Sequence, residues 1–218
     1  CHRYLELINQ FSTDFEQRPV EGNDTMMVQY TGGTTGRPKG AELSLRNLMY
    51  NPLQHGAYLP WEQGTEAVVT GFPMFHAAGL AFVIVTLRYG AQFALIPNPR
   101  DVEFMCAQMK ARPPTRLAAV PSLFQMLVDT PAFKEVDFSK LKIASSGAAP
   151  LSSGDRHNIE AIIGAGKISD VFGMTETGPV HVSNPPGRSV PSSVGIPVPG
   201  ADTRIVDLET GTQEMPFG

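Results

Sequence analysis

Two hydrophobic periods alternate along the chain. In five segments apolar residues recur every third or fourth position, which is the pattern of a helix with one buried face. The clearest case places Val102, Met105, Cys106 and Met109 on one face, with Asp101 able to cap the first turn. We predict helices over residues 44–50, 76–88, 101–112, 121–129 and 153–163. Short apolar and β-branched runs lie between them, and we predict strands over residues 26–30, 67–71, 91–96, 116–120, 141–145, 167–172 and 203–208.

The order of these elements indicates the fold class. Strands that alternate with helices imply crossover connections between parallel strands. The predicted fold is therefore α/β, with a mainly parallel sheet covered by helices on both faces. A proline-rich stretch over residues 184–199 has few side chains that can pack, and we place a domain boundary there. Residues 1–184 would form the α/β unit, and residues 185–218 a connection and the start of a β-rich subdomain.

Composition and charge narrow the classes of function. The 218 residues are 42% hydrophobic and 17% charged, which allows a sizeable core and excludes a disordered or disulfide-stapled chain. The formal net charge is -4 and the Lys and Arg residues are scattered, so no nucleic-acid surface is expected. The partners should be small molecules or protein.

Cysteine usage and hydropathy indicate the compartment. Cys106 lies in an apolar helical pattern, where we expect a buried thiol. The most apolar run, residues 77–87, is about half the length that crosses a bilayer, and no signal sequence opens the chain. We expect a cytoplasmic chain without a transmembrane segment. The start at Cys1 and the end inside a turn-like segment lead us to expect a piece of a longer protein, which would be inactive alone.

A glycine- and threonine-rich loop carries the strongest chemical signal. Residues 28–40 read VQYTGGTTGRPKG, in which glycines free backbone N–H groups, threonines add hydroxyl donors and Lys39 adds a positive charge. These groups together suit a polyphosphate. The loop is not a Walker loop, because Lys39 follows Pro38 and precedes Gly40.

This ordered loop resembles the phosphate-binding signature of the adenylate-forming superfamily, which comprises acyl-CoA synthetases, luciferases and the adenylation domains of peptide synthetases. Its form is most similar to that of the fatty acyl-CoA ligases. Four further segments resemble family motifs and occur in the family's order: GFPMFHAAG (71–79), SGAAP (146–150), DVFGMTET (170–177) and VGIPVPG (194–200). The resemblance covers residues 26–218 and implies the fold of the synthetases' large N-terminal domain.

The resemblance implies a role for each motif. The loop would hold the β- and γ-phosphates of ATP through Thr31, Gly32, Gly33, Thr34, Thr35, Gly36 and Lys39. The nucleotide would also contact Gly147, Ala148, Ala149, Pro150, Asp170, Val171, Phe172, Gly173 and Met174, with Phe172 stacked on adenine. Thr175 would donate to the α-phosphate and Glu176 would bind Mg²⁺, so the implied catalytic residues are Thr175, Glu176 and Lys39. Phe75, His76, Gly79 and Gly147 would border the acyl pocket.

The implied activity is that of an AMP-forming acyl-CoA ligase. A carboxylic acid, in this branch a fatty acid, would attack ATP to give an acyl-adenylate and pyrophosphate, and coenzyme A would then take the acyl group. ATP, Mg²⁺ and coenzyme A are the implied cofactors and co-substrates. A homodimer stays open as an assembly.

Two other functions also stay open. The family carries a ribose-binding Asp and a catalytic Lys that this sequence lacks, so the chain could be a non-catalytic nucleotide-binding module. It could also be an aminoacyl-adenylating domain that serves a carrier protein. Outside the motifs, we predict that His2, His55, His157 and Trp61 are surface or packing residues, whereas His181 could face the same cleft.

Overall fold

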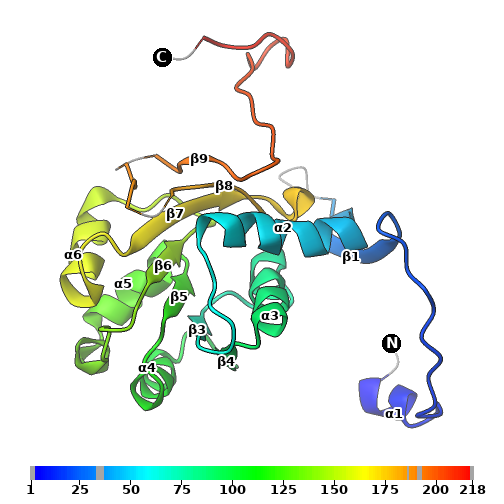
Figure 1. Cartoon of the computed structure of the whole chain (residues 1–218), viewed down its shortest axis with the longest axis horizontal. Coiled ribbons are helices and arrows are strands. Elements are labelled where there is room, and N and C mark those ends of the chain that lie inside the picture. Colours follow the sequence, from blue (N-terminus) through cyan, green and yellow to red (C-terminus); the bar gives the residue numbers. More distant parts are fainter. Residues whose placement is uncertain (1–2, 33–36, 186, 191–192, 217–218) are drawn as a thin grey trace.

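The computed structural model describes residues 3–32, 37–185, 187–190 and 193–216. Its centre is a seven-stranded sheet in the order β4-β3-β5-β6-β7-β8-β9 (Figure 1). Five neighbouring strands are parallel: β4 (Gln92–Ala94), β3 (Ala67–Thr70), β5 (Arg116–Ala119), β6 (Ile143–Ser146) and β7 (Ile168–Gly173). Two antiparallel strands, β8 (Val180–Ser183) and β9 (Ile196–Pro197), complete the sheet. The predicted α/β class with a mainly parallel sheet is confirmed.

One face of the sheet carries the main hydrophobic core. Val69, Leu117, Ala144 and Ile168 lie side by side on four adjacent strands and all belong to this core. Three helices cover them: α4 (Val102–Ala111), α5 (Pro121–Asp129) and α6 (Ser153–Ile163). These helices form where the apolar period predicts them, and Cys106 of α4 is fully buried as expected.

The opposite face of the sheet is covered by α2 (Leu45–Tyr58) and α3 (Ala77–Tyr89). Because side chains alternate along a strand, Val68 points away from the main core and packs in a second cluster with Trp61 and Val85. Helices therefore cover both faces, as predicted. Near the carboxyl ends of the strands this face carries small residues in register, Thr70, Ala118, Ser145 and Ser169.

A separate two-stranded hairpin precedes this body. β1 (Thr25–Thr31) confirms the strand predicted over residues 26–30, but it pairs with β2 (Lys39–Ser44), for which we predicted no strand. A short helix, α1 (Tyr4–Ile8), lies at the N-terminal end, and Figure 1 shows it away from the sheet, as it does residues 201–216. Two 3-10 turns, η1 (Pro131–Glu135) and η2 (Thr175–Thr177), complete the described elements.

Two predictions about elements are wrong. The strand predicted over residues 203–208 is absent: Val206 makes a single bridge to Glu214, and Ile205 and Leu208 are exposed to solvent. A short apolar and β-branched run does not form a strand where no neighbouring strand completes the ladder. The helix predicted over residues 44–50 is too short, because α2 continues through Pro52 to Tyr58. The domain boundary near residue 185 stays a prediction.

A buried ionic cluster joins the amino ends of three parallel strands. The Glu66 carboxylate, which is fully buried, accepts hydrogen bonds from Arg116 Nη2 (3.1 Å), Lys142 Nζ (3.0 Å) and the hydroxyl of Thr115. The Arg116 guanidinium also lies 4.1 Å from the centre of the Trp61 ring. Burial alone would raise the pKa of Glu66, but these hydrogen bonds and the Arg116 charge lower it to about 2. The cluster lies at the edge of the sheet opposite the pocket described next.

Candidate active site

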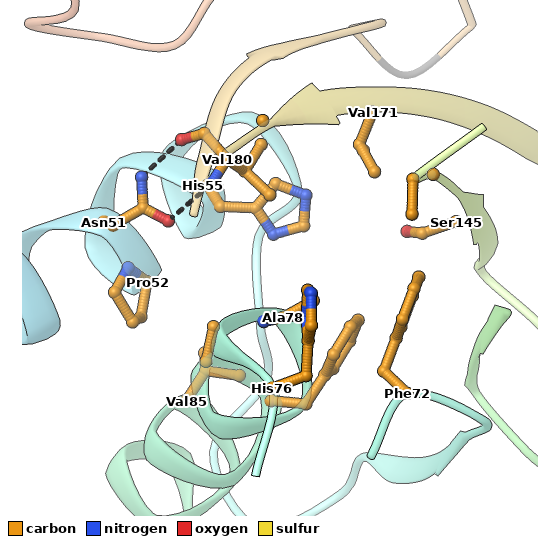
Figure 2. Close-up of a pocket in the computed structure, with 15 residues that line it drawn as sticks. Asn51, Pro52, His55, Phe72, His76, Ala78, Val85, Ser145, Val171 and Val180 are labelled. Atoms are coloured by element: carbon orange, nitrogen blue, oxygen red, sulfur yellow. Dashed lines mark hydrogen bonds between the residues drawn. The ribbon is translucent and has the colours of Figure 1, made fainter. Parts of the chain in front are cut away.

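A mainly apolar pocket of about 80 Å³ lies at the carboxyl ends of the parallel strands (Figure 2). In open α/β sheets this edge is the usual position of a ligand site. Three groups of residues form the walls. The sheet and its loops supply Phe72, Ser145, Gly147, Ala148, Val171, Gly173 and Val180, α3 with its N-cap supplies His76, Ala78, Ala81, Phe82 and Val85, and α2 supplies Asn51, Pro52 and His55.

Three of the predicted motifs meet at this pocket. His76 comes from segment 71–79, Gly147 and Ala148 come from segment 146–150, and Val171 and Gly173 come from segment 170–177. These segments are far apart in sequence, and the parallel strand order brings their ends together. The sequence motifs therefore converge on one cavity, although their individual chemical roles stay predictions.

His76 is fixed by its position at the start of α3. It is the N-cap residue, and its Nδ1 accepts a hydrogen bond from the Ala78 N–H at 3.2 Å. Since Nδ1 accepts, the neutral ring carries its proton on Nε2. His76 can therefore offer a hydrogen-bond donor to a molecule in the pocket.

Two other residues assigned to the acyl pocket lie elsewhere. The Phe75 side chain is 82% exposed, and it is absent from the residues that line the cavity. Gly79 is buried, and a Cβ at this position would lie 2.0 Å from the carbonyl oxygen of Pro73. This glycine thus permits α3 to approach the preceding loop closely.

The turn after β6 brings backbone atoms to the pocket. A Cβ on Gly147 would lie 2.7 Å from Cγ2 of Val171, so only glycine allows this close approach between the ends of β6 and β7. Ala148 has a φ of 67°, in the left-handed region that alanine rarely adopts. Such strain is common where a backbone is shaped for a ligand. Ala149 and Pro150, from the same motif, lie outside the lining of the pocket.

The end of β7 is held by an ion pair beneath it. Asp170 pairs with Arg156 of α6, and Arg156 Nη1 also donates to the carbonyl of Ile168 at 2.9 Å. Burial raises the pKa of Asp170, and the Arg156 charge opposes this effect. These contacts fix the strand from which Val171 and Phe172 project.

Phe172 offers an exposed aromatic face beside the pocket. Its ring is 46% exposed and meets the His181 ring edge-on, with 5.1 Å between ring centres. His181 Nδ1 lies 3.0 Å from the hydroxyl of Thr177, and burial lowers its pKa. His181 therefore supports the ring of Phe172 on β7.

The phosphate-loop motif is described only at its two ends. Thr31 and Lys39 face each other in the β1–β2 hairpin, and Gly32 follows Thr31. Gly33, Thr34, Thr35 and Gly36 lie outside the described residues. β2 packs against η2, which contains Thr175 and Glu176 and follows Met174. The ends of the loop and the Thr-Glu motif thus belong to adjoining elements.

The sequence did not lead us to predict that α2 lines the pocket. Asn51 is buried and exchanges two hydrogen bonds with the backbone of Val180, donating through Nδ2 and accepting at Oδ1 (3.1 Å). His55, predicted as a surface or packing residue, is half-buried and lines the pocket. A stripe at positions 48, 52, 55 and 59 could have revealed this helix face, because these positions lie on one side of a helix that continues past residue 50.

His55 is uncharged at neutral pH. Burial, together with the positive charge of Arg116, lowers its pKa to about 4. The other isolated residues behave as predicted: His157 is exposed, and Trp61 is buried and stacks on Tyr89. His2 lies outside the described residues.

The described residues contain no cluster of three or more His, Cys, Asp or Glu side chains suited to a metal ion. Within these parts of the chain, every helix falls short of the length and apolar character needed to cross a bilayer.

Comparison with known proteins agrees with the motifs. The profile of the family described as AMP-binding enzyme matches residues 4–217. A long-chain-fatty-acid–CoA ligase of Yersinia pestis is 35% identical over 200 residues, which are 90% of this chain and 35% of that protein. The chain therefore spans about a third of the length of this relative.

Solved structures share the fold. ATP-bound MatB from Rhodopseudomonas palustris superposes with a TM-score of 0.84 at 31% identity, over 98% of this chain and 42% of that one. A malonyl-CoA ligase with methylmalonyl-CoA and AMP bound superposes with a TM-score of 0.74 at 28% identity, over 85% of this chain and 40% of that one.

Proposed function

The chain belongs to the AMP-binding enzyme family, and from this premise we propose that it carries the acyl- and adenylate-binding part of an AMP-forming acid–thiol ligase. In the proposed reaction a carboxylate oxygen attacks the α-phosphate of ATP, and pyrophosphate leaves. The thiol of coenzyme A then attacks the acyl carbonyl, and AMP leaves as the thioester forms. Relatives with bound ATP, or with bound AMP and an acyl-CoA, support this choice of substrates.

One observation carries the proposal: a single apolar cavity is lined at once by His76, by Gly147 and Ala148, and by Val171 and Gly173. An acyl-adenylate needs an apolar site for its acyl group directly beside a site for its nucleotide. Phe172, next to Val171, has a ring face free for adenine stacking. The geometry supports the acyl group in the cavity and the adenine outside it.

The lining favours an acid with an uncharged chain. The described residues that form the cavity include no Lys, Arg, Asp or Glu. A second carboxylate or an amino group would lose its hydration there without gaining an ion pair. We propose a monocarboxylic acid of the fatty type, in line with the long-chain ligase of Yersinia pestis, over an amino acid or a dicarboxylic acid.

The proposed roles of the phosphate-binding residues follow from their chemistry. Thr31, Gly32, Gly33, Thr34, Thr35, Gly36 and Lys39 would hold the β- and γ-phosphates. Thr175 would donate to the α-phosphate, where negative charge accumulates as the carboxylate attacks. Gly147, Ala148, Ala149 and Pro150 would present backbone to the nucleotide, and Asp170, Gly173 and Met174 would complete its surroundings.

Mg²⁺ fits the residues present. Glu176 is exposed at η2 and makes no ion pair among the described residues. Mg²⁺ usually binds one or two carboxylates together with phosphate oxygens and water, so a lone exposed carboxylate next to Thr175 suits it. When bound, the ion would neutralise charge on the phosphates. Glu176 would hold it, and Lys39 would add a second positive charge.

Calorimetry with a stable acyl-adenylate analogue tests the proposal. In this analogue a sulfamoyl group replaces the phosphate. We expect the chain to bind hexanoyl-sulfamoyl-adenosine at least tenfold more tightly than the same compound without its acyl group. Equal affinities for both compounds would contradict an acyl pocket beside a nucleotide site.

A variant of the metal ligand separates the competing functions. Glu176→Gln should weaken binding of Mg–ATP to the chain while leaving metal-free ATP binding unchanged. In a longer protein that joins this chain to the family's ribose-binding Asp and catalytic Lys, the same substitution should slow carboxylate-dependent exchange of pyrophosphate into ATP. Glu209→Gln, in an exposed turn, is the matched control. Binding of Mg–ATP without any exchange in that longer protein would favour the non-catalytic module. Exchange driven by amino acids instead of fatty acids would favour the carrier-protein alternative.

A further inference from the structure

One buried polar atom without a hydrogen-bond partner lies in the mainly apolar wall of the pocket. Figure 2 shows the His55 imidazole extending from α2 into the cavity, above His76 and across from Ser145. Its Nε2 is buried and has no hydrogen-bond partner among the described residues. Among the described residues that line the pocket, His55 alone has a buried side-chain polar atom without a hydrogen-bond partner.

The state of this imidazole defines what it can bind. Its pKa of about 4 leaves the ring uncharged at neutral pH, so it cannot attract a carboxylate as an ion pair. A neutral imidazole has one N–H donor and one nitrogen acceptor. A hydroxyl group both donates and accepts, so it can pair with Nε2 in either tautomer.

Buried polar groups are normally hydrogen-bonded. The unpaired Nε2 of His55 lies in the pocket wall, so it can pair with a polar group on a molecule bound there.

We propose that His55 is a specificity residue that hydrogen-bonds a hydroxyl group on the acyl chain of the substrate. The preferred acid would then be a hydroxylated fatty acid and not a plain alkyl acid of the same length. This inference rests on the proposed function, because it needs an acyl chain in the cavity. A plain alkyl chain would cover Nε2 and leave it unpaired, which disfavours that substrate.

The test compares acyl-adenylate analogues by calorimetry. The compounds are hexanoyl-sulfamoyl-adenosine and its derivatives with one hydroxyl group at carbon 3, 4, 5 or 6. The unmodified chain should bind one of the hydroxylated compounds about tenfold more tightly than the plain one, which is the effect of one well-formed hydrogen bond.

Two variants identify the group responsible. His55→Leu should abolish the preference for the hydroxylated compound and should bind the plain compound at least as well as before. His55→Gln, which keeps a hydrogen-bonding side chain, should retain part of the preference. The measured quantity is the ratio of the affinities of one variant for the hydroxylated and the plain compound. A smaller fraction of folded protein lowers both affinities equally, so it does not change this ratio.

The possible failures are distinct. If every hydroxylated compound binds the unmodified chain no better than the plain one, or if His55→Leu keeps the preference, the role of His55 is refuted while the acyl pocket stands. If no acylated compound binds better than the unacylated one, the proposed function itself fails.

Discussion

Replacing Glu66 by Gln should destabilise the chain strongly, because this carboxylate compensates the buried cation of Arg116 and the partly exposed cation of Lys142. The Glu66 side chain is fully buried, its partner Arg116 is 4% exposed, and Lys142 is 37% exposed. Gln keeps the shape of Glu but removes its charge. The buried guanidinium would then lack its counter-charge, and removing one partner of a buried pair typically costs about 3–5 kcal/mol.

The shifted pKa gives a second measure of the same interaction. The pKa of Glu66 falls from 4.5 to about 2 on folding. A shift of this size corresponds to about 3 kcal/mol, since each pKa unit is worth about 1.4 kcal/mol. Because the folded-state pKa is the lower one, this stabilisation is present above pH 4.5 and is lost as the pH falls toward 2. About half of this stabilisation should be lost by pH 3.

Urea unfolding followed by circular dichroism between pH 7 and pH 3 measures both effects. The free energy of unfolding of Glu66→Gln should lie about 3 kcal/mol below that of the unmodified chain at pH 7, and the gap should narrow by about half at pH 3. Glu135→Gln is the control, because Glu135 pairs with Lys110 at the surface and is 68% exposed. Glu135→Gln should lower the free energy of unfolding by less than about 1 kcal/mol. A small difference in the free energy of unfolding between Glu66→Gln and the unmodified chain, or a difference that stays constant with pH, would refute the reasoning.

Other predictions concern close packing and thiol chemistry. Gly79→Ala should lower the free energy of unfolding by about 2–3 kcal/mol, because the new Cβ would meet the Pro73 carbonyl oxygen at 2.0 Å. Gly154→Ala, in open space on α6, should instead raise it by about 0.5–1 kcal/mol in the same urea assay, and equal effects would contradict the contact. Burial raises the pKa of Cys106 to about 11, so in a Cys1→Ser background a thiol reagent should label Cys106 only as the chain unfolds. Fast labelling of the folded chain would disprove this.

Local rules predicted the helices that begin and end with clear signals. α5 and α6 have their predicted bounds, since Pro121 opens the first and Ser152 caps the second. α2 extends past the predicted end at residue 50 and contains Pro52, although an internal proline normally ends a helix. Here Pro52 is buried in the pocket wall, and the neighbouring Asn51 is bonded to Val180, so tertiary contacts keep the helix continuous.

The strands show where local pattern fails. β8 and β9 lie in or beside segments rich in Gly and Pro, and the alternation of Val180 and Val182 with polar residues in β8 covers only four positions. β8 forms because β7 offers a free edge, and β9 pairs in turn with β8; only the assembled sheet provides these edges. The segment 203–208 shows the converse, because its apolar residues meet only the short segment 213–215 and no strand of the seven-stranded sheet.

The site was predictable only as far as the motifs reach. His76, Gly147 and Val171 come from three separate motifs and line one cavity, because parallel strand order fixes which loop ends meet, and their chemical roles stay predictions. They could not reveal His55, which comes from a helix continued by tertiary contacts, or the outward position of Phe75. Which way a side chain points at a helix start depends on a cap, and the cap here uses His76.

The alternation along β6 has a consequence for how this protein can change. Ala144 faces the main core, whereas its neighbour Ser145 faces the cavity. Cavity size can therefore be altered at Ser145 without repacking α4, α5 and α6. Substitutions on that side of the strand would change the shape of the cavity while the opposite side keeps the chain folded. The two faces of β6 thus separate the requirements of ligand fit from those of stability.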